Sequence, residues 1–493
     1  MPVELVKPLL MFKSSFFNLL GGVVRLIVAT ISIPLLVKAL GVSLFGLYSI
    51  VNAITIVISL AEWSISISTT VHVADNPNKK VLGACFWVTM MLGLVLGCLI
   101  YLSSYFVQVF LISFSPEQQE QVSFLLKITS LTTIFRIPHQ FFIGLEQAYN
   151  RYDAQNLITT VYNLLFYIGS IFIAGYTHSL TGIFIWQFFI MVLGLIMHIA
   201  YTSKSKFYTS FSSLFSWSGA EIKKVLSYCS SIWPSSLGAA LFTQGDRLLI
   251  GRLLGSELTG IYAAATSITT QINNISALPA QPLSSYIKSK DVVDDTHLLN
   301  QTISNTVYLN VFISVASAIT IICFSVEINL LILGNISNYE NASLILPTLA
   351  GIYAVYSFNA VGYYILFGVF KQALNTIIIL ISGIVTLILI YLLTMQIGIL
   401  GAAIGNIGFW LTLFCLVYGY RAVSFSLIYV IRIYIFGFLS LILSFGSLYY
   451  NELYIRMFIF LLCMFLLIRA LPTKIVEQTQ QKLKAKYYKW KNI

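Results

Sequence analysis

The apolar residues of this chain fall into long blocks, and these blocks restrict the fold more than any other feature. A helix of about 20 predominantly apolar residues is long enough to cross the hydrocarbon core of a bilayer. Charged residues make up only 9% of the chain, whereas about 25% is usual in a soluble domain, so such a chain could not cover a water-exposed surface. The sequence therefore predicts an all-α, polytopic membrane protein.

Short polar stretches separate fourteen apolar segments, and we predict that each segment crosses the membrane. Fourteen spans of about 20 residues leave no room for a sizeable soluble domain. The predicted spans are 14–39, 46–71, 82–112, 122–144, 155–176, 180–202, 228–253, 258–286, 302–333, 342–369, 373–395, 399–420, 429–448 and 453–471.

Lysine and arginine are concentrated in alternate loops, which predicts the orientation. Most of the 28 basic residues fall on one side, and this side includes the lysine-rich segment after the last span. Basic residues next to spans stay on the cytoplasmic side, so both termini are predicted to be cytoplasmic. The first apolar stretch is too long for a signal peptide and lacks a small-residue cleavage site, so we expect it to remain as the first helix. The basic tail could also bind anionic lipid headgroups.

Motifs of enzymes and of metal sites are missing from the sequence. No Gly-Lys dipeptide occurs, which excludes a P-loop, and no H-E-x-x-H pattern is present. The cysteines lie far apart within apolar spans, where we expect small core residues; they are Cys85, Cys98, Cys229, Cys323, Cys415 and Cys463. We predict no catalytic residue, no metal ligand, no cofactor and no nucleic-acid partner.

One short motif occurs twice, each time between two predicted spans. Residues 40–48 and 254–262 both follow the pattern L-G-x-x-L-x-G-[LI]-Y. An even number of spans separates the copies, so the two halves share one orientation, as in transporters built from parallel repeats. We predict two parallel six-helix bundles, 1–202 and 225–420, a cytoplasmic linker at 203–224, and two additional helices with a basic tail at 421–493.

Five charged residues lie well inside predicted spans, where each costs about 2.5–3.5 kcal/mol on insertion scales. They are Arg25, Glu62, Arg136, Asp246 and Arg247. Polar residues accompany them at helical spacing: Asn18 shares a face with Arg25, and Asn273 belongs to a polar stripe in span eight. Two interpretations remain open. These residues line an aqueous cavity, or they hold helices together, with Arg25 and Glu62 as a plain buried ion pair.

The residue types suggest which ligand such a cavity would bind. Arginine presents a planar fork that matches phosphate oxygens, so Arg25, Arg136 and Arg247, together with Asn18 and Asn273, are the predicted substrate-binding residues. An ion-coupled carrier needs a carboxylate that can change its charge state, and Glu62 and Asp246 are the candidates for ion coupling.

The chain resembles the polysaccharide-transporter family of lipid-linked oligosaccharide flippases, of the Wzx type, within the multidrug/oligosaccharidyl-lipid/polysaccharide exporter superfamily. The resemblance covers the first twelve spans. It rests on the motif at 40–48, on Asp246-Arg247 with Ile250-Gly251-Arg252, on Gly260-Ile261-Tyr262 and on Gly144-Leu145-Glu146-Gln147.

This resemblance implies two six-helix bundles around a central cationic cavity that opens alternately to either side of the bacterial inner membrane. It implies an undecaprenyl-diphosphate-linked sugar repeat unit as the substrate, used for O-antigen or another surface polysaccharide, with a polymerase and glycosyltransferases as possible partners. Arg25, Arg136 and Arg247 would then contact the diphosphate or sugar acids.

Two alternatives differ from a flippase in function. A multidrug and toxin cation antiporter of the same superfamily typically needs an acidic residue near span one, where this chain offers Arg25 and no carboxylate. A non-transporting scaffold would use the polar stripes only to hold its helices together.

Overall fold

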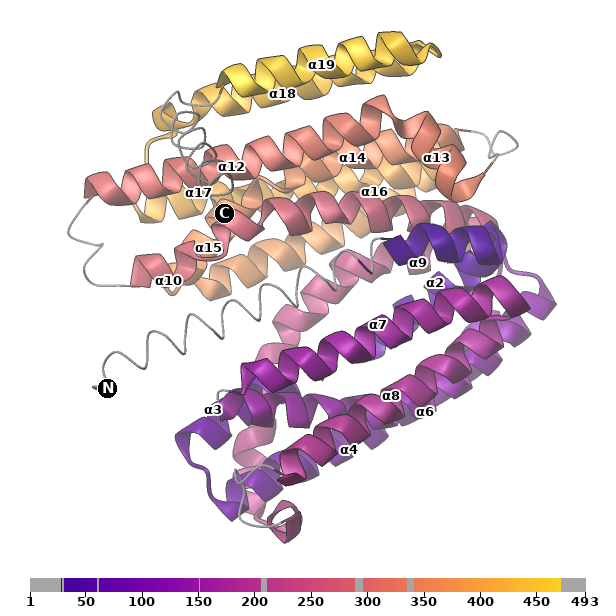
Figure 1. Cartoon of the computed structure of the whole chain (residues 1–493), viewed down its shortest axis with the longest axis vertical. Helices are drawn as coiled ribbons and strands as arrows, with labels where there is room; N and C mark the ends of the chain where they lie inside the picture. The colour runs from indigo at the N-terminus through magenta and orange to yellow at the C-terminus, as the bar shows by residue number, and fades with distance from the viewer. Residues whose placement is uncertain are drawn as a thin grey trace, which may run out of the picture. The chain divides into compact units, whose positions relative to one another are not determined.

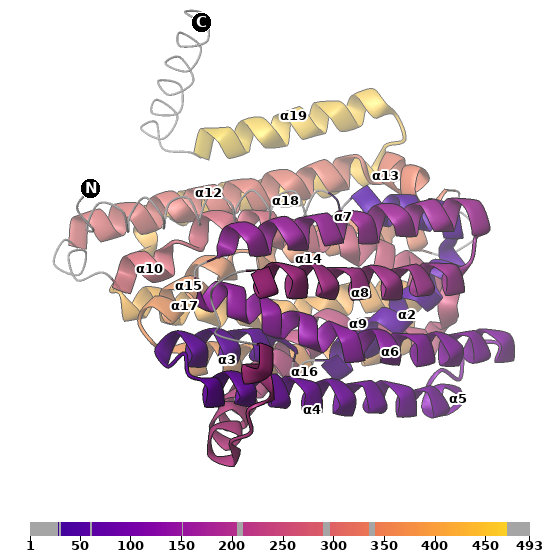
Figure 2. The ribbon, with the colours of Figure 1, turned by 60° about the horizontal axis from the view of Figure 1, so that its bottom comes forward.

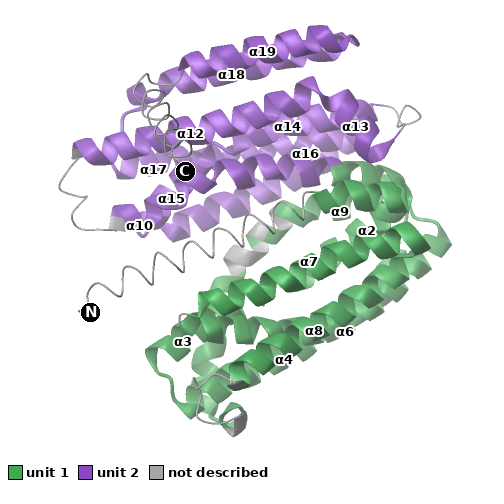
Figure 3. Cartoon of the chain, viewed as in Figure 1, with its two compact units in different colours: residues 1–264 green, residues 265–493 purple. Residues whose placement is uncertain are grey.

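The computed structural model describes residues 28, 31–59, 62–149, 151–204, 211–288, 296–334 and 341–470. The described residues form helices and connecting segments without a β-strand. Their contacts divide the chain into two compact units, residues 1–264 and 265–493 (Figure 3). The prediction of an all-α chain is therefore confirmed.

The helices have the length and composition of membrane spans. Eight of those in the described part of the chain are long and apolar enough to cross a membrane: Lys79–Phe110, Tyr152–Thr177, Leu180–Ser203, His297–Cys323, Ala342–Gly368, Gln372–Ala422, Ile431–Tyr449 and Leu453–Ala470. One helix also exposes a continuous apolar face, formed by Ile377, Ile381, Ile384 and Ile388. An apolar stripe of this kind on the outside of a helix fits contact with lipid rather than water.

Unit 1 consists of closely packed helices joined by short connections (Figure 1). Its described part includes a short apolar helix, Ile31–Leu40. The other elements are α2 (Val42–Ile58), α3 (Glu62–Asp75), α4 (Lys79–Ser103), η2 (Ser104–Phe106), α5 (Val107–Phe110), α6 (Pro116–Ala148), α7 (Tyr152–Thr177), α8 (Leu180–Lys204), η3 (Phe211–Phe215) and the part of α9 (Gly219–Ser276) that precedes residue 265.

Helix α6 organises unit 1, because it packs against α3, α4 and α8, while α7 packs mainly against α8 and also contacts α6. Figures 1 and 2 both show α4, α6 and α8 running side by side. The start of α6 is specified locally. Ser115 accepts a hydrogen bond from the Gln118 backbone N–H, the Gln118 side chain accepts one from the Ser115 N–H, and Pro116 follows the cap. This capping box satisfies two N–H groups that the helix leaves unpaired.

Unit 2 contains the rest of α9 and the C-terminal helices. Helix α12 is central, since α14, α18 and α19 all pack against it. The elements are η4 (Leu278–Ala280), α10 (Leu283–Lys288), α12 (Thr296–Cys323), α13 (Ser325–Leu333), η5 (Ala342–Leu344), α14 (Ile345–Tyr356), α15 (Asn359–Gly368), α16 (Gln372–Gly405), η6 (Asn406–Thr412), α17 (Leu413–Ala422), η7 (Leu427–Tyr429), α18 (Ile431–Phe445), η8 (Gly446–Tyr449) and α19 (Leu453–Ala470).

Several predicted spans are divided in the structure. Span two becomes α2 and α3, span nine becomes α12 and α13, and span ten becomes α14 and α15. Span seven and most of span eight lie in α9, where Gly255 interrupts the helical backbone, and span eight continues into η4 and α10. The boundary between the two compact units falls between residues 264 and 265, so the first part of α9 belongs to unit 1. The domain limits expected from the repeat, 1–202, 203–224, 225–420 and 421–493, stay a prediction.

The expectation for the cysteines needs one correction. Five of the six are buried, but Cys98 on α4 is exposed. Its neighbours Leu94, Val95 and Leu99 are exposed as well. Cys98 therefore belongs to an outward apolar face of α4 rather than to the core.

The two copies of the repeated motif contact each other inside unit 1. Gly41 and Gly255 hold equivalent positions, and both have a positive φ, 79° and 82°, which glycine adopts at little cost. A Cβ on Gly46 would overlap the Ser256 carbonyl oxygen, and a Cβ on Gly260 would overlap that of Val42. The motif glycines thus allow α2 and α9 to approach closely, backbone against backbone.

Candidate functional site

Glu62 and Arg136, two of the charges predicted inside the membrane, form an ion pair in unit 1. Arg136 Nη2 lies 2.9 Å from Glu62 Oε2, and Gln140 Nε2 donates to Glu62 Oε1 at 2.8 Å. Arg136 and Gln140 are four residues apart on α6 and therefore share a face, which meets the first turn of α3. The carboxylate is further stabilised there, because a helix N-terminus favours negative charge.

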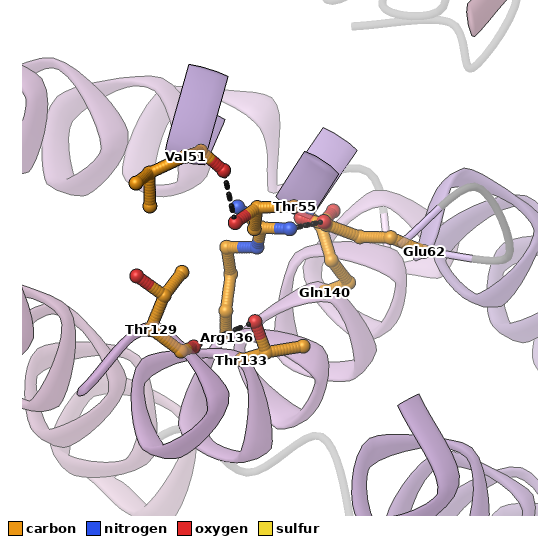
Figure 4. A network of polar contacts seen from close by, with 7 residues as sticks. All are labelled: Val51, Thr55, Glu62, Thr129, Thr133, Arg136 and Gln140. Carbon is orange, nitrogen blue, oxygen red and sulfur yellow. Dashed lines mark hydrogen bonds and ion pairs between the residues drawn. The ribbon is translucent and has the colours of Figure 1, made fainter. Parts of the chain in front are cut away.

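Polar groups of three helices surround this pair (Figure 4). The Arg136 side chain extends from α6 toward Glu62 and Thr55, and Thr55 on α2 is buried. The Arg136 and Glu62 side chains are 23% and 12% exposed. Arg136 Nε has no hydrogen-bond partner among the described residues. The guanidinium is thus held in one orientation by a neutralising carboxylate while part of its hydrogen-bonding capacity stays unused.

Asp246 and Arg247, adjacent on α9, have different surroundings. Asp246 is buried, and its carboxylate accepts hydrogen bonds from Tyr262 Oη (2.8 Å) and from the Arg247 backbone N–H (2.7 Å). Arg247 acts electrostatically on Tyr48 of α2. Arg247 also acts electrostatically on Asp246, although neighbours on a helix point about 100° apart.

Tyr48 and Tyr262 are the last residues of the two motif copies, and each places its hydroxyl in a polar contact. Tyr262 bonds to Asp246, whereas Tyr48 Oη accepts a hydrogen bond from Gln187 Nε2 at 3.3 Å. Gln187 also donates to Ser170 Oγ at 3.2 Å. The repeated backbone thus presents two tyrosines to different partners, so the scaffold repeats while the polar groups around it differ.

A third polar cluster, which the sequence did not reveal, lies between α6 and α8. Glu146 Oε1 is 2.8 Å from His198 Nδ1, and both side chains are buried. The His139 ring packs edge-on against His198, with ring centroids 4.6 Å apart. In the sequence, Glu146 was noted only as part of the motif at Gly144–Gln147. The histidines fit no metal or catalytic spacing, and His198 lies 52 residues beyond Glu146 in the sequence, so no sequence pattern indicates that the three residues meet.

The structure brings Glu62 and Arg136, two of the predicted site residues, into direct contact. Arg136, Glu62, Asp246 and Arg247 all belong to unit 1, and Asn273 is a half-buried residue of unit 2. Asn18 and Arg25 lie outside the described residues. The ion pair between Arg25 and Glu62 that the sequence suggested therefore stays a prediction. Among the predicted site residues that the structure describes, the guanidinium groups of Arg136 and Arg247 balance the carboxylates of Glu62 and Asp246, so the predicted cationic excess depends on Arg25.

No cluster of three or more His, Cys, Asp or Glu side chains in the described ranges is placed to hold a metal ion. The substrate-binding and ion-coupling roles assigned to individual residues stay predictions.

Solved structures with the same fold are transporters. The chain is similar to a structure described as "Lipid II flippase MurJ, inward closed conformation", with a TM-score of 0.70, 14% identity, and coverage of 92% of this chain and 98% of that one. It is also similar to an inward-facing multidrug resistance MATE family transporter of the MOP superfamily, with a TM-score of 0.70, 14% identity, and coverage of 81% and 94%. At this identity the likeness shows a shared fold: a polytopic, all-α membrane protein.

Sequence comparison gives the family. No protein of curated function matches the chain significantly. The profile of the family described as "Polysaccharide biosynthesis protein" matches residues 11–288, more than half of the chain and nearly all of unit 1. The resemblance noted from the motifs is thereby confirmed. The chain belongs to the polysaccharide biosynthesis protein family.

Proposed function

We propose that this protein is a flippase for an undecaprenyl-diphosphate-linked oligosaccharide repeat unit. It would act by alternating access as a multi-pass protein of the bacterial inner membrane, with both termini in the cytoplasm. The repeat unit would serve O-antigen or another surface polysaccharide. The observation that carries the proposal is the family match to polysaccharide biosynthesis across residues 11–288, joined to a fold shared with a lipid II flippase.

The charged groups in unit 1 support an anionic substrate. Arg136 and Arg247 lie on helices α6 and α9 of a membrane protein. A guanidinium inside a membrane segment costs free energy of insertion, so such residues usually have a function. A diphosphate offers two groups of oxygens that arginine binds in a bidentate manner. Inside a membrane protein, where the effective dielectric constant is low, each such contact is stronger than in water.

The Glu62–Arg136 pair gives a simple way to exchange ion and substrate. While Glu62 is ionised, its carboxylate occupies the Arg136 guanidinium at 2.9 Å. A proton added to Glu62 would remove that competing charge, and the guanidinium would become available to a phosphate oxygen. Proton binding and diphosphate binding would then favour each other, since coupling between two ligands is reciprocal.

The test uses bacteria in which this chain is the sole flippase for a surface polysaccharide. Arg247→Ala should abolish the polysaccharide while the amount of membrane-inserted protein is unchanged, and Arg25→Ala should do the same. Arg421→Ala is the matched control, because Arg421 is an exposed guanidinium in the last turn of α17. Normal polysaccharide at normal abundance in both test variants would refute the cationic site.

The multidrug cation antiporter remains the alternative, since MATE family structures share this fold. An antiporter would confer resistance to cationic dyes, and deletion of the gene would leave the surface polysaccharide intact. The flippase predicts the opposite pair of results. Genes for glycosyltransferases and a polysaccharide polymerase beside this one would further support the flippase and its proposed partners.

A further inference from the structure

Three buried titratable side chains, two from α6 and one from α8, form a cluster that the proposed transport step does not use. Glu146, His139 and His198 are 3%, 3% and 0% exposed. The Glu146 carboxylate and the His198 imidazole share a contact of 2.8 Å, and His139 packs edge-on against His198. We name these three residues the Glu146 cluster.

The Glu146 cluster has polar atoms that no described residue satisfies. They are Glu146 Oε2, His139 Nε2 and His198 Nε2. A buried polar atom without a partner costs about 1–3 kcal/mol, so a contact that only joined two helices could be built more cheaply from apolar side chains. Each of these atoms can instead gain or lose a proton. The Glu146 cluster can therefore exist in more than one protonation state.

Other charged and titratable groups face the Glu146 cluster from the surrounding helices. Tyr162 of α7 contacts the His139 ring, with centroids 5.3 Å apart, and Arg136 acts on His139 electrostatically. Arg151 and Asp153, at the start of α7, act on Glu146 in the same way. Tyr201 of α8 lies under the Arg151 guanidinium, 5.4 Å from it. Glu62 of α3 is linked to the group through Arg136.

These groups are distributed along α6, from Arg136 to the start of α7. On α6, Arg136, His139, Ile143 and Glu146 follow helical spacing on one face, over about 15 Å of helix. Beyond Glu146, the chain emerges at Arg151 and Asp153, whose side chains are 37% and 48% exposed and form an ion pair at 3.2 Å. The exposed end lies on the predicted cytoplasmic side, and the other end reaches the proposed diphosphate site.

We infer that the Glu146 cluster is a proton-binding site, separate from the Glu62–Arg136 pair and filled from water at the Arg151 end. In its resting state, one proton is shared between Glu146 Oε1 and His198 Nδ1. A second proton, taken from water, binds one of the three unsatisfied atoms and raises the net charge of the cluster by one. No covalent bond other than that to the proton forms or breaks.

This assignment rests on the proposed function in one respect: it makes the proton a ligand coupled to diphosphate binding. A positive charge added beside Arg136 increases the attraction of this region for an anion. The same added charge makes proton binding stronger once the anion is present, because the coupling is reciprocal.

The test is a histidine titration that needs no transport substrate. The full-length protein, labelled with ¹⁵N-histidine and placed in lipid nanodiscs, is followed by NMR; its five histidines are assigned by substitution. The His139 and His198 signals should change together in one transition as the pH is lowered, because the two rings are in contact. Glu146→Gln should shift that transition by about tenfold or more in proton affinity, as expected for strongly interacting sites.

His72→Gln is the matched control, since the His72 ring bonds to the Ser68 carbonyl of its own helix at 2.8 Å; the transition should stay unchanged. If Glu146→Gln does not accumulate, His139→Gln serves as the second variant and should shift the His198 signal. Signals of His139 and His198 that do not titrate, or that titrate independently of Glu146, would overturn the assignment and leave a structural contact.

A second arm separates this inference from the proposed function. Undecaprenyl diphosphate added to the nanodiscs should shift the transition toward higher pH. A transition that depends on Glu146 but does not respond to the lipid supports the proton site and contradicts the diphosphate-binding role. A flippase that is active in cells but whose Glu146 cluster fails to titrate supports the proposed function and contradicts the proton site.

Discussion

Gly46 and Gly260 occupy equivalent positions in the two copies of one motif, and each packs against the backbone of the other copy. Gly46 faces the Ser256 carbonyl, and Gly260 faces that of Val42, which is the equivalent of Ser256. The hydroxyls of Ser43 and Ser256 also meet at 3.2 Å. Reciprocal contacts of this kind characterise a two-fold relation between like surfaces. The two copies of the motif therefore pack against each other in the fold, in addition to being similar in sequence.

This reciprocity predicts that alanine is equally harmful at both glycines. In Gly46→Ala and Gly260→Ala, the new methyl group would have to displace backbone, and overpacking typically costs about 1–3 kcal/mol or more. Both variants should show a lower midpoint of thermal unfolding in detergent and reduced protein in the membrane. Gly175→Ala is the control: its Cβ would meet nothing within 4 Å, so its midpoint should not fall. A large effect at only one motif glycine would contradict the two-fold packing.

A double-mutant cycle on Glu62 and Arg136 separates stability from transport. Glu62→Gln and Arg136→Gln each leave a largely buried charge without its partner, which destabilises the fold. The double variant should be destabilised by at least about 1 kcal/mol less than the sum of the two single changes, because the residues are in contact. The midpoint of thermal unfolding of the four proteins measures this.

The same four proteins report on function. If Arg136 binds the diphosphate, the double variant should fold well and still fail to support the surface polysaccharide. A stable double variant with full activity would show that the pair only joins α3 and α6. Glu221→Gln, which removes the carboxylate of the Glu221–Lys224 pair near the start of α9, controls for the loss of a surface carboxylate.

Replacing each of the two motif tyrosines should destabilise the protein to a different extent, although the motif is the same. Tyr262→Phe removes a hydrogen bond to the buried Asp246 carboxylate, and bonds to charged groups are worth about 1.5–3 kcal/mol. Tyr48→Phe removes a longer bond between neutral groups, worth about 0.5–1.5 kcal/mol. Thermal unfolding should rank Tyr262→Phe as the more destabilised variant. Equal losses would indicate that Asp246 is not ionised in the folded protein.

An asymmetric ion pair in unit 2 yields another prediction. Arg456 donates from both terminal nitrogens to Glu327, including Nη1 to Oε2 at 2.8 Å, and the Arg456 side chain is 5% exposed against 42% for Glu327. Glu327→Gln leaves a buried guanidinium without its counter-charge, and breaking such a pair costs about 3–5 kcal/mol when both groups are buried. Because Glu327 is partly solvated, we expect less than that, about 1–3 kcal/mol.

Arg456→Met is the partner variant in this experiment. Methionine keeps an apolar stem at this buried position of α19 and leaves Glu327 in contact with solvent. Its midpoint of thermal unfolding should therefore fall less than that of Glu327→Gln. The reverse order would mean that the guanidinium contributes through packing or through its bond to the Asn451 carbonyl rather than through the carboxylate.

Local sequence is enough to specify the helical membrane fold, the repeated motif and the presence of charges inside the helices. Those properties follow from composition and periodicity, since a block of apolar residues must be helical in lipid to satisfy its own backbone. Helical spacing likewise places Arg136 and Gln140 on one face of a single helix, and this needs no knowledge of the neighbouring helices.

Which groups meet depends instead on how the helices pack. Glu62 pairs with Arg136, and Glu146 with His198, across helices that lie far apart in the chain. Periodicity identifies the polar face of a helix, but it contains no information about which other helix covers that face. The Glu146 cluster is hidden for the same reason, because its members come from two helices and its chemistry arises only when α6 and α8 pack together.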